Sequence, residues 1–319
     1  MLASSIAIPL PLTRLPPWYP GQSGVPGTGT ETGLRVHTTG AVFYVDPNYP
    51  GVSDLRHGTE PLYPLATVGA ALTKCQPYRG DTILVMANNA WTYTNPALGW
   101  TTPIAEAVTV NVPGIRIVGV SPSGAVGVPW SVPTAQWGFT VAATDVLIEG
   151  FAFMGVGAGS NGIRATWGPP AAFGDNLVVR HCLFDDAILT AISLDFVWNA
   201  EVMGCAFEGC DYGIWCDTPG SSIESVRVIQ NWFQGCTLGA ITLPEAEDCL
   251  IVDNWVHAAV PATDTFIDLS AGGGNIVANN WLGCPLGVGA GQYGDVNSAG
   301  PGDQWIANKC ADGTAITNP

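Results

Sequence analysis

An internal repeat is the feature that most constrains how this chain can fold. It is clearest at residues 226–236, which read Val-Arg-Val-Ile-Gln-Asn-Trp-Phe-Gln-Gly-Cys. With Asn231 as the reference position, the equivalent residues of the other copies are Val120, Phe151, Cys182, Cys205, Asn254 and Asn280. Successive equivalents are 31, 31, 23, 26, 23 and 26 residues apart. A period of roughly 20–50 residues is typical of proteins built from stacked structural repeats.

Each copy also contains a second short apolar segment, in which an isoleucine recurs and the next residue varies. The isoleucines are Ile163, Ile192, Ile214, Ile241, Ile267 and Ile316, and the following residues are Arg164, Ser193, Trp215, Thr242, Asp268 and Thr317. A constant inward position beside a variable outward one has the period of a β-strand. Because strands this short are not stable alone, the copies must stack on one another. The repeat therefore predicts an all-β fold, a parallel β-solenoid.

Residues 41–100 precede the clear copies and predict an N-terminal cap with a first coil, while residues 101–319 form the remaining coils. Leu65, Val68, Leu72 and Cys75 have helical spacing, and Pro64 suits the first position of a helix. We expect this short cap helix to cover the first coil, whose strand edge would otherwise be exposed.

The same region contains a set of short motifs. They are Phe-Tyr-Val-Asp at 43–46, Gly-Thr-Glu-Pro at 58–61, Pro-Leu-Ala-Thr-Val-Gly-Ala-Ala-Leu at 64–72, Gly-Asp-Thr-Ile-Leu-Val at 80–85 and Trp-Thr-Tyr at 91–93. This order resembles the opening of pectate-lyase-like right-handed parallel β-helix proteins. The column of Asn231, Asn254 and Asn280 is similar to that family's asparagine ladder, in which stacked amides hydrogen-bond along a bend. The resemblance covers about residues 42–317 and implies a single-stranded right-handed parallel β-helix.

The resemblance leaves activity open. The family includes lyases, hydrolases, epimerases, phage tailspikes and capsid-bound phage proteins, so its fold alone does not define a function.

Charge and hydropathy exclude some partners. The chain has 10 Lys+Arg against 26 Asp+Glu, a net charge of −16, and such a surface repels nucleic acid and anionic membranes. No apolar run reaches the ~18 residues of a membrane span. The first residues lack a basic region, and Pro9 and Pro11 interrupt their apolar run, so we expect no secretion signal.

Six of the nine cysteines lie at apolar positions of the repeat: Cys182, Cys205, Cys210, Cys216, Cys236 and Cys249. We expect small buried side chains with reduced thiols, which favours assembly inside a cell. A zinc site is the alternative, but the chain has no Cys-x-x-Cys spacing and its four histidines are scattered. We therefore predict no metal and no cofactor.

Residues 1–40 are rich in proline and glycine, which exclude a helix or a central strand. The segment is more apolar than a solvated tail usually is. Its candidate contact residues are Ile6, Ile8, Leu10, Leu12, Trp18 and Tyr19. We predict an extended arm that becomes ordered on a partner, with a disordered tail as the alternative.

Asp185 and Glu208 are the best catalytic candidates, because they occupy one column in adjacent coils, and Asp211 lies nearby. Carboxylates about 5 Å apart have the spacing of a retaining glycosidase pair. The alternative is that they are solvent-facing acids at turns of an acidic protein. Lyase chemistry is less favoured, because Arg180 has an expected partner in Glu149, one coil earlier.

Two neighbouring columns predict an apolar stripe on the outside of the rod. Met203, Ile229 and Val252 belong to one column, and Trp232, Trp255 and Trp281 to the other. Apolar patches of this kind on soluble proteins mark interfaces. Cover by a loop of the same chain, such as residues 285–303, and a ligand platform are the alternatives.

These observations favour a structural virion protein, either capsid-decorating or capsid- or tail-associated. It would act as a symmetric homo-oligomer, a trimer by analogy with the phage proteins it resembles, and attach to a capsid or other virion protein through residues 1–40. We expect it in the virion after assembly in the host cytoplasm. The alternative is a polysaccharide-degrading enzyme or tailspike depolymerase that binds a surface glycan.

Overall fold

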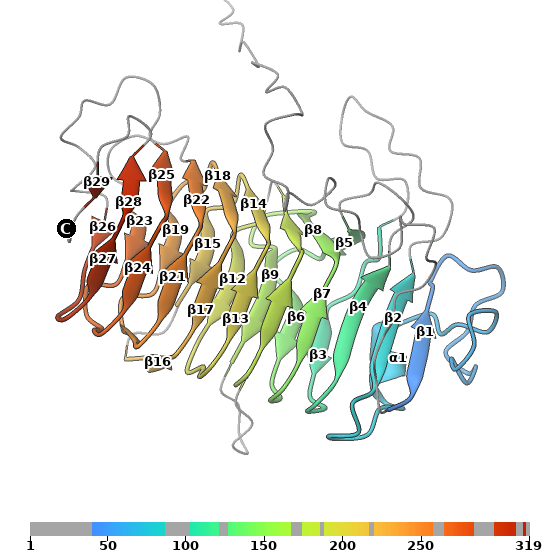
Figure 1. Cartoon of the computed structure of the whole chain (residues 1–319). Helices are drawn as coiled ribbons and strands as arrows, with labels where there is room; N and C mark the ends of the chain where they lie inside the picture. Colours follow the sequence, from blue (N-terminus) through green and yellow to red (C-terminus); the bar gives the residue numbers. More distant parts are fainter. Residues whose placement is uncertain are drawn as a thin grey trace, which may run out of the picture.

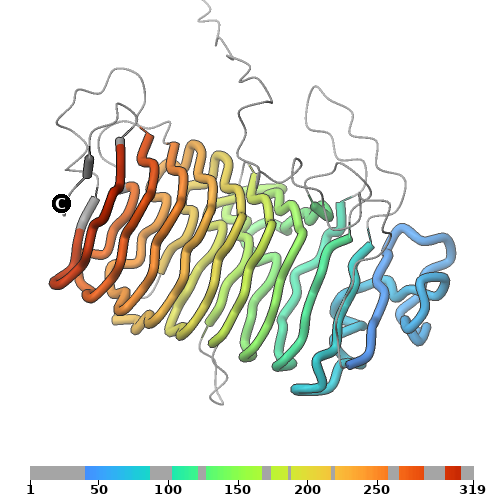
Figure 2. Tube along the Cα trace, viewed as in Figure 1, coloured from blue at the N-terminus to red at the C-terminus, as the bar shows by residue number. Residues whose placement is uncertain are grey.

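The computed structural model describes residues 40–86, 103–120, 127–166, 174–185, 188–216, 220–257, 265–283, 297–310 and 315–316. Its strands are stacked in sequence order along a rod, from blue β1 at one end to red β27 at the other (Figures 1 and 2). All strand pairs are parallel except β28 with β29. The described chain is a parallel β-solenoid, as the repeat predicted. The right-handed winding and the three domain boundaries stay predictions.

Three sheets run along the rod, and from β4 to β26 each coil contributes one strand to each sheet. Sheet 1 contains β1 (Val42–Val45), β2 (Thr82–Met86), β4 (Arg116–Val120), β7 (Leu147–Glu149), β10 (Val178–Arg180), β13 (Glu201–Met203), β17 (Arg227–Ile229), β21 (Leu250–Val252), β24 (Ile276–Ala278) and β27 (Gln304–Ile306). Sheet 2 contains β5 (Val128–Val132), β8 (Phe151–Gly155), β11 (Leu183–Phe184), β14 (Ala206–Glu208), β18 (Trp232–Gln234), β22 (Trp255–His257), β25 (Trp281–Gly283), β28 (Asn308–Cys310) and β29 (Ala315–Ile316). Sheet 3 contains β3 (Val108–Val110), β6 (Trp137–Val141), β9 (Asn161–Ala165), β12 (Thr190–Leu194), β15 (Tyr212–Trp215), β19 (Gly239–Thr242), β23 (Thr265–Asp268) and β26 (Asn297–Ser298). β16 (Ile223–Glu224) and β20 (Ala246–Glu247) form a further two-stranded sheet.

Residues with positive φ make the bends between sheets. Between sheets 1 and 2 they are Gly150, His181, Gly204, Gln230, Asp253, Asn279 and Ala307, with φ between 49° and 79°. Before sheet 1 they are Gly114, Asp145, Asn176, Asn199, Ser225, Asp248, Gly274 and Gly302, with φ between 51° and 82°. Glycine, asparagine and aspartate prevail because they adopt the left-handed region at the lowest cost. One such residue at each bend turns the backbone sharply without a long loop.

The inward columns form one continuous core. Ile163, Ile192, Ile214, Ile241 and Ile267 are in register and buried, as predicted. Phe184, Phe207 and Phe233 stack face to face, with ring centroids 5.1 and 4.4 Å apart. Gly213 lies against the ring of Phe233, where an added Cβ would come within 2.8 Å of it. The glycine therefore lets the aromatic stack fill the core beside sheet 3.

The asparagine ladder is present and longer than predicted. Cys182, Cys205, Asn231, Asn254 and Asn280 share one column, because the residues that follow them are paired coil by coil. Asn308 continues this ladder, and its Oδ1 accepts hydrogen bonds from both nitrogens of Asn280 at 2.9 Å. A second, shorter ladder, which the sequence analysis missed, joins Cys249, Asn275 and Asp303 at the bend before sheet 1. Both ladders satisfy backbone N–H groups that the bends leave without a sheet partner.

Two predicted column members were wrong. Val120 pairs with Met86 in sheet 1, while Phe151 pairs with Val128 in sheet 2, so Val128 holds the ladder position of that coil. Ile316 belongs to β29, which runs antiparallel to β28, and pairs with Asn308 instead of extending the isoleucine column. Both predictions extended the repeat by sequence spacing alone. The number of residues between equivalent positions changes at that bend and at the end of the rod.

The helix α1 (Val68–Leu72) begins later than predicted, with Thr67 rather than a residue near Pro64 as its N-cap. Glu106 accepts hydrogen bonds from the backbone N–H groups of Val68 and Gly69 at 3.0 and 2.8 Å. Leu65 instead donates its backbone N–H to Tyr44 of β1 at 2.9 Å, on the outer edge of sheet 1. That α1 closes the end of the rod stays a prediction.

All six cysteines predicted to be buried, together with Cys75, are buried thiols in the described part of the chain. Burial raises the pKa of Cys236 to about 12, and the nearby carboxylate of Asp211 acts in the same direction. These side chains fill space as small hydrophobic groups.

Candidate functional site

The predicted apolar stripe lies on the outside of sheets 1 and 2. Met203, Ile229 and Val252 are in register on sheet 1, and Trp232, Trp255 and Trp281 are in register on sheet 2. The residues next to them in sequence on the same strands, such as Val228 and Phe233, belong to the core. The tryptophan rings follow one another with centroids 4.7 and 6.0 Å apart. Each of the two predicted columns is therefore in register along its own sheet.

Exposure of the apolar stripe increases toward the C-terminal end of the rod. Trp232 is only 5% exposed and packs with Ala152, Leu183 and Ala206 in a cluster separate from the main core, whereas Trp281 is 37% exposed. Two further residues that the sequence analysis missed, Ile276 and Ile306, are 39% and 51% exposed on the last strands of sheet 1. The sequence could have predicted both residues, because both fall in outward columns of the repeat.

Ion pairs occupy the same outer side of sheet 1 nearer the N-terminus. Glu201 lies 2.5 Å from Arg180 and 3.2 Å from Arg227, while Glu149 lies 3.1 Å from His181. The expected pairing of Arg180 with Glu149 was therefore wrong. The two residues are in register, but the guanidinium reaches toward the following coil, where a second arginine shares the carboxylate.

The candidate carboxylates lie at the end of the sheet 2 strands. The pairing of Phe184 with Phe207 puts the next residues, Asp185 and Glu208, one coil apart as predicted. Asp185 is buried, Glu208 is partly exposed, and Asp211 accepts a 2.5 Å hydrogen bond from Thr237 Oγ1. That hydrogen bond gives Asp211 a structural role at the bend. The catalytic role of the three residues stays a prediction.

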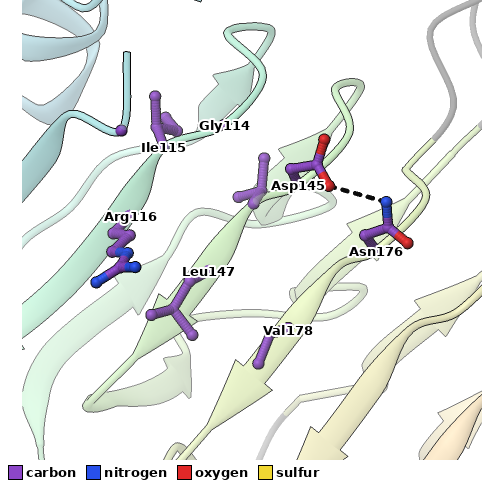
Figure 3. A pocket seen from close by; sticks show the side chains of 9 residues that line it. Gly114, Ile115, Arg116, Asp145, Leu147, Asn176 and Val178 are labelled. Atoms are coloured by element: carbon purple, nitrogen blue, oxygen red, sulfur yellow. Dashed lines mark hydrogen bonds between the residues drawn. The ribbon is translucent and has the colours of Figure 1, made fainter. Parts of the chain in front are cut away.

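A groove of about 380 Å³ lies at the bend before sheet 1 (Figure 3). Its wall includes the aliphatic side chains of Leu147 and Val178, with the exposed Arg116 beside them. Asn176 Nδ2 donates to Asp145 Oδ1 at 2.8 Å across two successive bends, as Figure 3 shows. This hydrogen bond joins adjacent coils, so its residues have a structural purpose.

A second face, on the side of sheet 3 away from the core, mixes half-buried aromatic side chains with polar ones, of which Thr190 and Ser193 are fully buried. One column contains Trp137, Asn161, Thr190 and Tyr212, and the other contains Arg164, Ser193, Trp215, Thr242 and Asp268. The second column is the variable one of the sequence repeat. The first was missed, because Gly162 and Ile163 both face the core and this breaks the simple alternation.

Two kinds of site do not occur in the described residues. They contain no group of three or more His, Cys, Asp and Glu side chains that could hold a metal ion. No described helix is long and apolar enough to cross a membrane. The predicted attachment residues Ile6 to Tyr19 lie outside the described residues.

Known proteins are similar to this chain in structure but not in sequence. No family model and no curated protein matches the sequence. The solved structure of GH136 lacto-N-biosidase from Eubacterium ramulus is similar, with a TM-score of 0.56 and 11% identity, over 85% of this chain and 56% of that chain. Weaker matches are the surface adhesin PfbA of Streptococcus pneumoniae (TM-score 0.43, 11% identity, 74% of this chain and 70% of that one) and a rhamnogalacturonan lyase (TM-score 0.43, 14% identity, 77% and 69%). The chain spans little more than half the length of the lacto-N-biosidase, and identity this low shows the fold alone. This protein has a parallel β-helix fold.

Proposed function

We propose that this protein is a structural component of a virion, capsid-decorating or capsid- or tail-associated, and that it works as a symmetric homo-oligomer. The observation that carries the proposal is the exposed apolar surface formed by the C-terminal end of the apolar stripe and a neighbouring column of sheet 1. Trp281, Ile276 and Ile306 present apolar side chains to solvent in three adjacent columns, on a protein whose net charge is −16.

A second copy of the same rod is the partner that suits this surface. Apolar side chains recur along it at the strand spacing of about 4.8 Å, so ridges on one copy fit between ridges on another. Burying apolar surface contributes about 25 cal/mol per Å². Two rods of charge −16 repel each other, so salt should strengthen their association by screening that repulsion. Closed symmetry, with three copies about an axis along the rods, buries the stripe on every copy.

Residues 1–40 would then attach the oligomer to a capsid or other virion protein, after assembly in the host cytoplasm. The support is their composition, since an apolar, proline-rich segment loses little conformational entropy when it binds in an extended form.

Light scattering of stripe variants tests the oligomer. We expect Trp281→Glu to give monomers with an unchanged circular dichroism spectrum, because a charge in the interface is costly when unpaired. Leu238→Glu is the matched control, since Leu238 is 45% exposed but lies on a link outside the stripe. A parent protein that is monomeric at micromolar concentration would contradict the oligomer.

Deletion of residues 1–33 tests the attachment role. Normal particle binding by the shortened protein would contradict that role.

A polysaccharide-degrading enzyme is the second candidate, favoured by the adjacent positions of Asp185 and Glu208. Its test is release of reducing ends from a panel of bacterial and algal polysaccharides. Activity that falls by orders of magnitude in Asp185→Asn and Glu208→Gln would establish the enzyme and displace the purely structural role.

A further inference from the structure

The groove at the bend before sheet 1 runs along the rod across four coils (Figure 3). Its lining residues lie at or just before the start of β2, β4, β7 and β10, and three coil spacings of about 4.8 Å make it about 14 Å long. Gly80 and Gly114 have no side chains to fill its first half, while the half-buried Leu147 and Val178 form an apolar wall in its second half. A groove of this shape suits an extended segment of chain.

The part of the chain that the structure describes begins beside this groove. Its first residue is Gly40, and a Cβ added to Gly40 would lie 2.7 Å from the backbone of Gly80, which lines the groove. The backbone N–H of Ala41 donates to Asp81 Oδ1 at 2.7 Å and fixes this point of the chain. The residues that precede Gly40 are therefore tethered at one end of the groove and need no long link to reach it.

The sequence just before Gly40 has the pattern of a strand that is apolar on one side. Residues 34–38 read Leu-Arg-Val-His-Thr, so Leu34 and Val36 alternate with polar side chains. In contrast to residues 9–33, this stretch has no proline or glycine. Five extended residues span about 16 Å at about 3.3 Å each, which is close to the length of the groove, and Thr39 remains as the link to Gly40.

The charges around the groove favour the same segment. Asp145 is exposed in the groove wall, and the half-buried Asp175 lies beside it, with its backbone oxygen 3.0 Å from the backbone nitrogen of Asp145. Arg116 contributes one positive charge, so these three side chains together carry a net negative charge. Arg35 brings a positive charge and residues 34–38 contain no acid, which suits an acidic groove on a protein of net charge −16.

We propose that residues 34–38 lie in this groove in an extended form, with Leu34 against Val178 and Val36 against Leu147. The base of the arm is then fixed along sheet 1, and residues 1–33 leave the rod near β10 instead of at the end where β1 lies. This anchor does not depend on what residues 1–33 bind or on the apolar stripe, so it is independent of the proposed virion role.

Limited digestion of the full chain with trypsin tests the anchor, because residues 1–39 contain two arginines, Arg14 and Arg35, and no lysine. A synthetic peptide of residues 1–39 gives the ratio of the two cleavage rates when neither bond is protected. Relative to Arg14, we expect the bond after Arg35 to be cleaved about tenfold or more slowly in the folded protein than in the peptide. Mass spectrometry of the shortened chains measures both rates.

Variants on both sides of the contact locate the protection. Leu147→Glu should abolish it by placing a charge in the apolar wall, and Val36→Asn should abolish it when compared with a peptide that has the same substitution. Leu189→Glu is the matched control, since Leu189 is 41% exposed but does not line the groove. Melting curves show whether each variant is folded.

Equal rate ratios in the folded protein and in the peptide would overturn the proposal. Protection that survives Leu147→Glu or Val36→Asn, or that is lost in Leu189→Glu, would also overturn it, because the segment would then be held elsewhere. Protection that weakens on dilution would mean that the arm of a second copy fills the groove, which again contradicts the proposal.

Discussion

The side-chain nitrogen of Asn231 lies 3.0 Å from Oδ1 of Asn254, one coil further along the rod. The same oxygen accepts the backbone N–H of Asn231 at 2.9 Å, and Asn231 Nδ2 also donates to Val202 O at 2.9 Å. Each amide thus replaces, at a bend, the strand-to-strand hydrogen bonds that a sheet would supply. Repeated through Asn254, Asn280 and Asn308, this pattern keeps every coil in register with the next.

Asn254→Ala should destabilise the protein by roughly 1–3 kcal/mol for each group it leaves without a partner. The substitution removes the acceptor of the Asn231 N–H and the donor to Val228 O, both at buried positions. Urea unfolding followed by circular dichroism measures the change. Lys309→Ala, at an exposed position, is the control, and equal midpoints for the two variants would show that the ladder contributes no stability.

Cys205→Asn should extend the ladder by one coil and raise the melting temperature. The Cys205 N–H already donates to Asn231 Oδ1 at 2.9 Å, and its thiol already faces Val179 O at 3.8 Å, where an amide nitrogen would make a stronger hydrogen bond. Differential scanning calorimetry of the variant and the parent protein measures the difference in melting temperature. A lower melting temperature would mean that the neighbouring Cys182 leaves too little room for an amide.

Asp81 should make the N-terminal end of the rod sensitive to acid. Burial alone would raise the pKa of Asp81, but hydrogen bonds from Arg79, Gln76 and Ala41 outweigh it and hold that pKa below its ordinary value of 3.8. The stabilisation is present above pH 3.8 and is lost as pH falls through the lower, folded-state pKa. Urea midpoints measured from pH 6 to pH 2 should fall less steeply in Asp81→Asn. If the urea midpoint fell equally steeply with pH in the parent protein and in Asp81→Asn, this role of Asp81 would be contradicted.

The buried thiols should be unreactive in the folded protein. Burial, with a contribution from Asp81, raises the pKa of Cys75 to about 12, and burial raises that of Cys249 to about 11, so neither forms thiolate at pH 8. We expect an aromatic disulfide reagent to label at most two of the nine cysteines rapidly, since seven are buried, and all nine after denaturation. Rapid labelling of three or more in the native state would show that the coils open readily.

The inward columns could be predicted from sequence because stacking imposes a simple rule. When coils lie directly above one another, equivalent residues face the same neighbours, so Ile192 and Ile214 or Asn254 and Asn280 must be chemically compatible. That compatibility appears in the sequence as a repeat. The same rule explains the six stripe residues, which lie in columns that the repeat had already aligned.

Contacts among outward side chains could not be predicted in this way. Arg164 pairs with Asp195, 31 residues later, and Arg180 pairs with Glu201, 21 residues later, although Glu149 is in register with Arg180. A long side chain can reach up or down the rod, and the direction depends on local bends and on competing partners such as Arg227.

The sequence by itself therefore determined the parallel β-helix and its asparagine ladder, because burial and hydrogen bonding restrict every inward position to a few residue types. Only the tertiary structure decided which surface residues meet. It placed Trp137 beside Arg164, buried Trp232 while leaving Trp281 exposed, and moved the ladder position from Val120 to Val128. The physical reason is that links of different length join the strands, so the position of an outward side chain depends on geometry that the repeat does not encode.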